Sequence, residues 1–255
     1  MVSVIIPMYN SRDYILDAIK SVVKQNVKKE IIIIDDGSTD DSMDIVMNYL
    51  NENLKLLGDD KNRFFVRKNS QNMGVAATRM AGVKIANHPY IAFLDSDDMW
   101  ADDKLSKQLL VIQKTNSDIC NTSRVMCDKD GTLLDKTIGT SKEYITLKDL
   151  EKTNYINCSS VLIKKDIIMK YPMKHAKDAH EDYYAWLMAA QNNARICNID
   201  EPLLIYRLSE GGKSRNKIKS AIMTFKTYKY AGYGIFKAFF MMFSYTVNGI
   251  KKYKN

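Results

Sequence analysis

The sequence of 255 residues is poor in the features that mark disulfide-rich, zinc-binding or membrane-spanning chains. No C-x-x-C spacing occurs among its four cysteines, which are Cys120, Cys127, Cys158 and Cys197. This argues against a zinc site or a disulfide framework and fits a reducing compartment. No apolar run reaches the about 20 residues that a membrane-spanning helix needs. No internal repeat and no Pro-, Gly- or Ser-rich linker divides the chain.

The composition instead predicts a folded core. Hydrophobic residues make up 45% of the chain, which favours a globular protein over a disordered one. The length suits one large domain or one and a half. The first residues, Met1–Pro7, carry no basic region, so we expect a first strand there and not a signal peptide.

Positive charge is concentrated near the C-terminus. From Leu203 onward there are nine lysines and two arginines but only one acid, Glu210, so this part has a net charge of +10. The net charge of the whole chain is +8, so residues 1–202 together have a net charge of −2. A basic chain is typical of proteins that meet nucleic acid, a membrane or an acidic substrate. Because the larger part is near neutral, we expect the tail alone to meet an anionic partner and expect no nucleic-acid binding.

The first half of the chain alternates between strand and helix patterns. The expected strands are Val2–Pro7, Glu30–Ile34, Arg63–Arg67 and Tyr90–Leu94. The expected helices are Asp13–Val23, one capped by Ser38 or Thr39 and running to about Asn51, Val75–Ala86, and Asp102 to about Thr115. This alternation predicts βαβ units around a parallel sheet.

The second half has a mixed pattern. The expected elements are a strand at Asp118–Met126, a hairpin turn at Asp128–Gly131, a strand at Asn157–Lys164, a helix at Tyr183–Gln191 and an extended segment Ile196–Arg207 broken at Pro202. We expect one α/β domain over residues 1–215, in which 1–100 and 101–215 are halves that share a cleft. A basic, aromatic helical tail follows at residues 216–255.

Two acidic turns follow apolar strands. Asp95–Asp98 comes directly after Tyr90–Leu94, and Asp35–Ser38 follows Ile31–Ile34. Carboxylates gathered at a buried strand end repel one another, and a divalent cation such as Mg²⁺ or Mn²⁺ relieves that repulsion while binding substrate phosphates. Two such ends predict one ligand site along the carboxyl edge of the sheet.

Five motifs together resemble family 2 glycosyltransferases over roughly residues 1–215, in the family's order and spacing. They are Val2–Asn10, Ile34–Asp40, Asn72–Gly74 with Arg79, Leu94–Asp98, and Glu181-Asp182. The resemblance implies the GT-A fold of nucleotide-diphospho-sugar transferases, with a mostly parallel central sheet and helices on both faces. It also implies transfer of a sugar from a nucleotide sugar with inversion at the anomeric carbon.

The resemblance also implies donor-binding roles for Pro7, Tyr9, Asp36, Asn72, Arg79, Asp95, Ser96, Arg207 and Arg215. The Tyr9 ring is expected to cover a nucleobase, the alternative being packing on the first helix. Asp36 is expected to accept hydrogen bonds from uracil, which makes the donor a UDP-sugar, and Asp35 to hold the loop or touch ribose. For both acids the alternative is helix capping. Arg79 is expected to pair with Asp95 or Asp36, or to reach the diphosphate.

The D-x-D sequence of the second turn implies a metal site. Asp97 is the expected ligand of Mn²⁺ or Mg²⁺, and Asp95 is expected to meet a ribose hydroxyl directly or through water. Asp98 is expected to support the metal ligand or to cap the helix from Asp102. The metal would neutralise the departing diphosphate.

Glu181 and Asp182 open a predicted helix, and the resemblance places the catalytic base at Asp182. Inverting transfer needs one base to take the proton of the acceptor hydroxyl. Glu181 is expected to bind acceptor hydroxyls. The alternative is that both acids stabilise the first turn of their helix. The preceding His180 is expected to be structural.

The segment Tyr206–Arg215 resembles the family's loop near the diphosphate, and its two glycines suit a lid that closes Arg207 and Arg215 over phosphates. Many relatives carry a histidine here that helps to hold the metal. This chain has Leu208 and Ser209 instead, so no third protein ligand is expected from this loop.

The tail contains the apolar, aromatic run Ile235–Tyr245 among lysines. A basic, aromatic helix of this kind suits the interface of an anionic membrane. The alternative is packing on the catalytic domain or a dimer partner. We therefore expect a cytoplasmic enzyme, peripheral on the inner face of a bacterial cell membrane, that extends a surface glycan or a lipid-linked acceptor.

Three other protein classes fit less well. A nucleotidyltransferase needs a Gly-rich phosphate loop after the first strand, and Met8–Asp13 contains no glycine. A receiver-like switch is much shorter and leaves Glu181-Asp182 unexplained. A transferase-like protein that binds nucleotide without catalysis is opposed only by the presence of Asp97 and Asp182.

Overall fold

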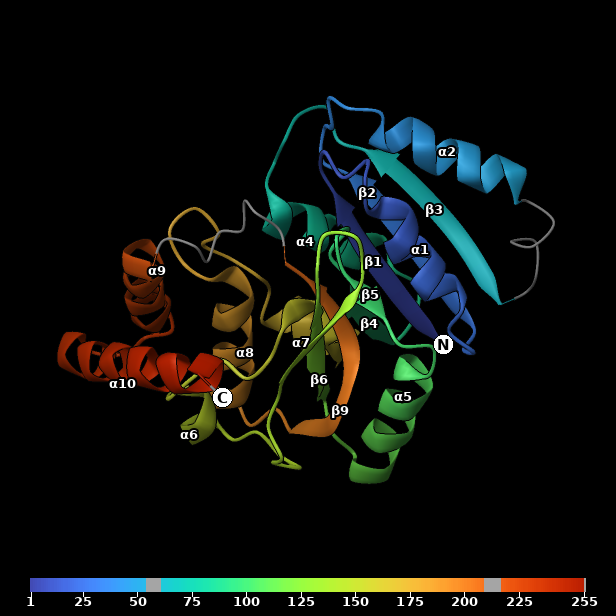
Figure 1. Ribbon diagram of the computed structural model, residues 1–255. Coiled ribbons are helices and arrows are strands. Elements are labelled where there is room, and N and C mark those ends of the chain that lie inside the picture. The colour runs from blue at the N-terminus through green and yellow to red at the C-terminus, as the bar shows by residue number, and fades with distance from the viewer. Residues whose placement is uncertain (54–60, 209–216, 255) are drawn as a thin grey trace.

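The computed structural model describes residues 1–53, 61–208 and 217–254 (Figure 1). Its first half runs through β1 (Val2–Met8), α1 (Ile15–Val23), β2 (Lys29–Asp35), α2 (Ser42–Glu52), β3 (Asn62–Lys68), α4 (Val75–Ile85), β4 (Tyr90–Phe93), β5 (Met99–Trp100) and α5 (Lys104–Thr115). The alternation of strand and helix predicted for this half is confirmed.

The second half is mixed, as expected. Its elements are β6 (Ile119–Cys127), β7 (Leu133–Ile138), α6 (Leu147–Leu150), the 3₁₀ turn η1 (Cys158–Ser160), β8 (Leu162–Lys164), α7 (Lys165–Lys170), α8 (Glu181–Gln191), β9 (Ile196–Arg207), α9 (Lys217–Tyr230) and α10 (Ile235–Lys254). The hairpin predicted at Asp128–Gly131 joins β6 to β7, which pair antiparallel.

One sheet of nine strands passes through the molecule in the order β3-β2-β1-β4-β8-β6-β9-β5, with β7 beside β6. Strands β3, β2, β1 and β4 are parallel to one another. The sheet then becomes mixed, because β8 runs antiparallel to β4 while β9 runs parallel to β6. The four parallel strands therefore share one carboxyl edge.

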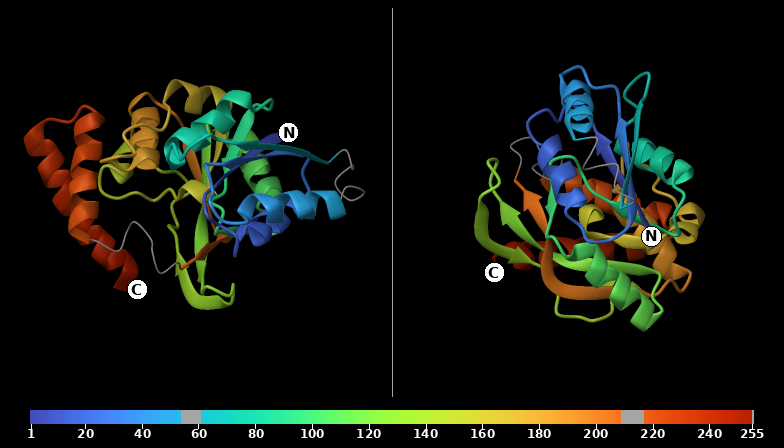
Figure 2. Two further views of the ribbon diagram at one scale, coloured as in Figure 1. Left: turned by 90° about the horizontal axis from the view of Figure 1, so that it is seen from above. Right: turned by 90° about the vertical axis from the view of Figure 1, so that its right-hand side faces the viewer.

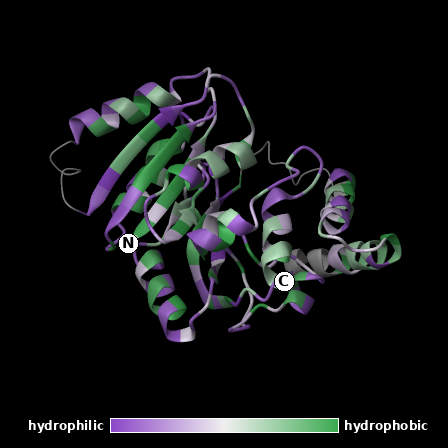
Figure 3. Cartoon of the chain, turned by 180° about the vertical axis from the view of Figure 1, so that it is seen from behind, coloured by the Kyte–Doolittle hydropathy of each residue, from purple (hydrophilic) through white to green (hydrophobic). Residues whose placement is uncertain are grey.

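Helices cover both faces of this sheet, as predicted. Alternate residues of a strand point to opposite faces, so Ile5 and Ile32 lie in one core and Ile6 and Ile33 in the other. Helices α1, α2 and α5 contribute to the second core, and α4, α7 and α8 to the first. Strands buried on both faces need continuous apolar runs, and the central strands show that character along most of their length (Figure 3).

Three local predictions are wrong. Helix α2 begins at Ser42, and Ser38 and Thr39 do not cap it; instead the side chain of Asp40 accepts a hydrogen bond from the Ser42 amide. Cys158–Ser160 is a 3₁₀ turn, capped by the Asn157 side chain, which accepts from the Ser159 amide, and only Leu162–Lys164 is strand. Strand β9 is not broken at Pro202 but continues past it with a shift of register against β6.

The segment predicted as a tail packs on the domain. Tyr228 of α9 and Ala238 of α10 are fully buried in the core that also contains Ile5 of β1. Both helices lie at the end of the molecule opposite α2 and β3 (Figures 1 and 2). Within the described residues, no helix has both the length and the apolar character that crossing a membrane requires.

Candidate active site

The predicted donor residues meet at the carboxyl edge of the parallel strands. Met8 at the end of β1 is paired with Asp35 at the end of β2, and the Asp36 amide donates to the Met8 carbonyl. On the other side of β1, the Leu94 amide donates to the Ile5 carbonyl, which carries β4 into the Asp95–Asp98 turn. The two acidic turns therefore flank the end of β1, as expected for a ligand site at this edge.

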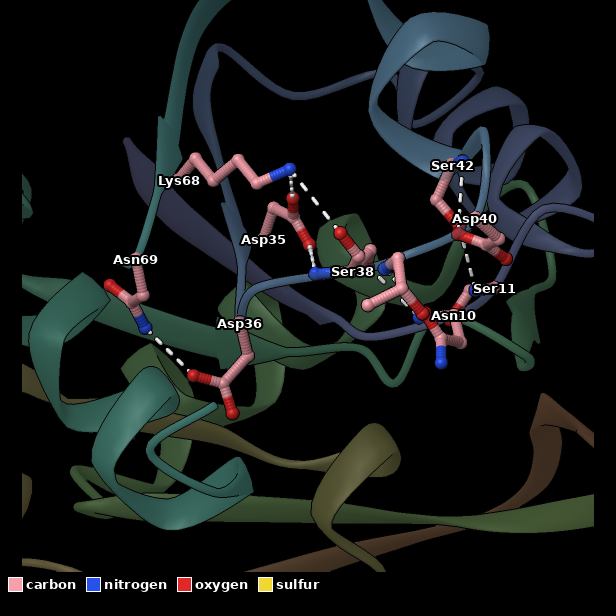
Figure 4. A network of polar contacts seen from close by, with 10 residues as sticks. Asn10, Ser11, Asp35, Asp36, Ser38, Asp40, Ser42, Lys68 and Asn69 are labelled. Atoms are coloured by element: carbon pink, nitrogen blue, oxygen red, sulfur yellow. Dashed lines mark hydrogen bonds and ion pairs between the residues drawn. The ribbon is translucent and has the colours of Figure 1, made fainter. Parts of the chain in front are cut away.

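Asp35 holds the loop that follows β2 (Figure 4). One of its carboxylate oxygens accepts from the Ser38 amide at 2.9 Å, and the other lies 3.5 Å from the Lys68 ammonium on β3. Asn10, two residues beyond the end of β1, contacts the same loop, because its side chain accepts from the Thr39 amide at 2.9 Å. Of the two roles left open for Asp35, the structure supports the holding of the loop.

Gly37 lets this loop pass close to the segment before α4. Its φ is +79°, and a Cβ there would lie 3.1 Å from the backbone nitrogen of Asn72. A side chain at this position would meet both backbone strain and a close contact with backbone that cannot move aside. The glycine thus sets the distance between the loop and Asn72.

Asp36 is buried and organises the same segment. Its carboxylate accepts from the amides of Met73 and Gly74 at 2.9 and 2.8 Å and from the Asn69 side chain at 2.8 Å. Burial alone would raise the pKa of Asp36, but these hydrogen bonds outweigh it and lower that pKa below its usual value. Asp36 therefore stays ionised, and it does not cap α2.

The remaining donor candidates of this region differ in exposure. Pro7 is buried within β1, whereas Asn72 is exposed. Tyr9 is 47% exposed just beyond β1, so its ring is not packed away against α1. An exposed ring just beyond β1 suits stacking on a nucleobase.

The D-x-D turn is fixed from two sides. The Asp95 amide donates to the Ser159 hydroxyl at 3.1 Å, and Ser96 shares a 2.6 Å hydrogen bond with Ser11. Burial, and then the charge of Asp95, raise the pKa of Asp97 to about 6. A cation near Asp97 would favour its ionised form.

Asp98 and Arg207 connect the D-x-D turn to the end of β9 through hydrogen bonds. Asp98 is buried and accepts from the Arg207 amide at 3.1 Å, so the prediction that it caps α5 is wrong. The Arg207 guanidinium is also buried, and it donates to the carbonyls of Asp97 and Lys129 and to the carboxylate of Asp17. This placement contradicts a mobile phosphate contact for Arg207. Arg215 and residues 209–214 lie outside the described residues.

Arg79 of α4 joins the two parts of the site. Its guanidinium lies 2.5 Å from a carboxylate oxygen of Asp95 and 3.2 Å from one of Glu181, and its side chain is 5% exposed. Burial opposes the charged form, but the two acids outweigh it and hold the pKa of Arg79 above its usual value. Of the roles left open for Arg79, the structure supports pairing with Asp95 and shows Glu181 as a second partner.

Glu181 and Asp182 form the first turn of α8, as predicted. Burial, and then the charge of Glu181, raise the pKa of Asp182 to about 6, while Arg79 and a hydrogen bond from the Tyr183 amide limit the rise. Glu181 lies against Arg79, which limits its freedom to meet an acceptor. The pKa suits a group that takes up a proton near neutral pH.

Residues of α9 that the sequence did not single out support this turn. The His180 amide donates to the Thr227 hydroxyl at 3.0 Å, which agrees with a structural role for His180. The Tyr183 and Tyr228 hydroxyls lie 2.8 Å apart in the core behind α8. These contacts involve pairs 45 to 47 positions apart, so no local pattern signals them.

The carboxylates of the D-x-D turn fit a metal ion that is bound mainly by the diphosphate of a donor. In the part of the chain that the structure describes, no three His, Cys, Asp or Glu side chains gather as a complete metal site. Mg²⁺ and Mn²⁺ commonly bind through one or two carboxylates plus the oxygens of a diphosphate. Asp97, with its raised pKa beside Asp95, is a suitable carboxylate for such a shared site.

Known sequences similar to this chain are glycosyltransferases. The sequence model named Glycosyl transferase family 2 matches residues 3–171. TuaG of Bacillus subtilis, assigned to teichuronic acid biosynthesis, is 34% identical over 99% of this chain and 97% of its own length. WfaP of Escherichia coli, named as a UDP-Glc:α-D-GlcNAc-diphosphoundecaprenol β-1,3-glucosyltransferase, is 31% identical over 99% of this chain and 95% of its own.

Solved structures share the fold. The S. aureus TarS fragment 1–349 in complex with UDP-GlcNAc has a TM-score of 0.70 and 21% identity, and the match covers 94% of this chain and 70% of that fragment. The mannosyltransferase PcManGT of Pyrobaculum calidifontis, solved with GDP-Man and Mn²⁺, has a TM-score of 0.70 and 14% identity, covering 95% of this chain and 68% of that protein. The predicted type of α/β fold is therefore confirmed.

Proposed function

The chain belongs to glycosyltransferase family 2, and on this premise we propose that it transfers a sugar from UDP to a lipid-linked glycan during synthesis of a bacterial cell-surface polysaccharide. The observation that carries the proposal is the pairing of Arg79 with both Asp95 and Glu181. This arginine places the D-x-D turn, where a donor diphosphate would lie, beside the helix that begins with the expected base.

Donor binding would use the loops after β1 and β2. Tyr9 is exposed and would stack on a base, and Asp36, which holds the segment that contains Asn72, would accept from the uracil imide. The name of WfaP includes UDP-Glc, and the TarS fragment was solved with UDP-GlcNAc, which supports the same nucleotide for this chain. Pro7 and Ser96 would shape the floor between these loops.

The diphosphate would lie at the D-x-D turn with Mn²⁺ or Mg²⁺. Asp97 would hold the metal together with phosphate oxygens, and Asp95, already paired with Arg79, would meet the donor ribose. When bound, the metal neutralises the charge of the departing diphosphate. The complex of PcManGT with GDP-Man and Mn²⁺ supports this choice of ion.

Asp182 would act as the catalytic base. The acceptor oxygen attacks the anomeric carbon, the bond between that carbon and the diphosphate oxygen breaks, and the hydroxyl proton passes to the Asp182 carboxylate. Attack from the face opposite the diphosphate inverts the configuration. The positive charge of Arg79 and the N-terminus of α8 favour the ionised form of Asp182, which is the form that can take up the proton.

The acceptor is proposed to be carried by a lipid, which places the protein on the inner face of the cell membrane. The name of WfaP includes a diphosphoundecaprenol acceptor. The positive charge of residues 203–255 would draw the protein toward anionic lipid headgroups.

Calorimetric titration of UDP, with and without Mn²⁺ and beside GDP and CDP, tests the donor. We expect binding that needs the metal and prefers UDP. Equal binding of all three nucleotides would contradict the proposed contact between Asp36 and uracil. Absence of any nucleotide binding, in the presence of Mn²⁺, would contradict the proposed function.

A further inference from the structure

Helix α10 has two faces of opposite character. Ala238 and Met241 are buried, at 0% and 7% exposure, against the domain. Phe236, Phe240 and Phe243 are 84%, 71% and 66% exposed. Together with Phe239 and Val247, they form a stripe at helical spacing, which we call the phenylalanine ridge. The ridge lies opposite the buried face.

The ridge is exposed although the helix is well anchored. Lys237 pairs with Glu151 at 2.9 Å, and the Tyr245 ring lies 5.7 Å from the Tyr183 ring in the core. The Ala238 amide donates to the Gly234 carbonyl, which fixes the start of the helix beside the turn from α9. The buried face therefore holds α10 in one orientation, with its phenylalanines directed outward.

Exposed aromatic side chains in a contiguous row mark a binding surface more often than they mark ordinary protein surface. Two partners have the required apolar character: a lipid bilayer and a second copy of the chain. A two-fold contact through this ridge would bring together two C-terminal regions of net charge +10 each, and like charges placed face to face oppose association. An anionic bilayer carries the opposite charge and an apolar interior.

The size of the ridge suits a helix that lies in the membrane surface. From Phe236 to Val247 it extends about 17 Å along the helix axis, at about 1.5 Å per residue. Three further lysines follow in the last five residues of the sequence, Lys251–Asn255. Aromatic residues along one face with basic residues nearby are typical of helices that lie at the level of the headgroups.

We propose that the phenylalanine ridge of α10 inserts into an anionic bilayer and so holds α8, the helix that contains Asp182, beside the membrane. The connection is direct: α10 packs on α9, and Thr227 of α9 accepts from the His180 amide, two positions before Asp182. That a lipid-linked acceptor is presented there rests on the proposed function. Insertion of the ridge does not.

Co-sedimentation with vesicles tests the proposal on the full chain. The vesicles are an equimolar mixture of phosphatidylglycerol and phosphatidylcholine, compared with pure phosphatidylcholine. The double variant Phe240→Ser/Phe243→Ser removes the centre of the ridge. Leu110→Ser is the matched control, because Leu110 is 66% exposed on α5, outside the ridge. Phe236→Ser, at the most exposed position of the ridge, replaces the double variant if thermal melting shows that the latter does not fold.

We expect the wild type to bind the anionic vesicles and not the neutral ones. Each serine should weaken binding about tenfold, because each removes a phenylalanine from apolar contact. The Leu110 variant should bind as the wild type does. Undiminished binding of a folded ridge variant would overturn the proposal, and so would a wild type that binds neither vesicle.

A second copy as the true occupant of the ridge would also overturn the proposal. Light scattering would then show a dimer of the wild type that dissociates in the ridge variant. UDP titration without vesicles separates this surface from the proposed function. If the ridge is needed for vesicle binding but UDP does not bind, the membrane surface stands and the donor assignment falls.

Discussion

Replacing Arg79 by methionine should both destabilise the fold and change the pH dependence of transfer. Methionine fills a similar volume but cannot pair with Asp95 and Glu181. Loss of one partner of a buried ion pair costs about 3–5 kcal/mol. Because the Asp95 side chain is 34% exposed, water would solvate it in part, so we expect a loss near the lower end, about 3 kcal/mol.

The effect on pH dependence separates a role in the active site from a role in stability alone. Asp182 can accept a proton only when it is ionised, so the rate should fall as the pH drops through its pKa of about 6. Arg79 lowers that pKa, so its removal should raise it by about one unit. The acidic limb of kcat/KM should therefore move to higher pH by about one unit.

The assay is sugar transfer from a UDP-sugar across a pH series, together with thermal melting of the same samples. A chain of this size should melt roughly 6–12 °C lower for a loss of about 3 kcal/mol. Lys107→Met is the control, since Lys107 forms exposed ion pairs with Asp103 and Glu201, which contribute little stability. An acidic limb of kcat/KM that does not move would refute the coupling of Arg79 to Asp182.

Three further substitutions test other parts of the site. Asp97→Asn should abolish the Mn²⁺-dependent part of UDP binding in calorimetry, and metal-dependent binding equal to that of the wild type would remove Asp97 from the metal site. Gly37→Ala should cost about 1–3 kcal/mol of stability and weaken UDP binding, because alanine is strained at a φ of +79° and its Cβ would press on the Asn72 backbone. An unchanged melting temperature and UDP affinity would show that the close approach of this loop to Asn72 has no role. Arg207→Met should cost about 1–3 kcal/mol, because it leaves the buried carbonyls of Asp97 and Lys129 without their side-chain donor, while the backbone bond to Asp98 remains; a melting temperature equal to that of the wild type would contradict the structural role of the guanidinium.

The donor edge could be predicted from sequence because its information is local. An apolar run followed by an acidic turn is visible in a few consecutive residues, and parallel strands bring their carboxyl ends together. Asp36, Asp95 and Asp97 were found in this way, and the structure places all of them at that edge. The direct roles of these residues toward donor and metal remain predictions.

Arg207 could not be read correctly from its neighbours in the sequence. It stands shortly before Gly211-Gly212 in the sequence, and a basic residue near such a glycine pair usually suggests contact with solvent or phosphate. Its partner Asp17 is 190 positions away, and this distant contact draws the guanidinium into the core. The role of Ser159 was missed for a related reason, since the apolar residues after it favoured a longer strand than the one that forms.

The C-terminal segment shows a similar limit. Its charge and aromatic content predicted contact with a membrane or packing on the domain as alternatives. The structure shows that α10 packs by one face and leaves the other exposed, so the two possibilities are compatible. Composition cannot separate the two faces, because the division appears only when the helix is placed against α9.

Turnover and donor affinity of Asp182→Asn, measured on the same preparation, test the central claim most directly. Asparagine keeps the shape of the side chain but cannot take up the acceptor proton. The account predicts that UDP binding with Mn²⁺ stays at the wild-type level while sugar transfer is lost. Transfer at the wild-type rate would mean that the base is another residue, and would contradict the mechanism proposed for this site.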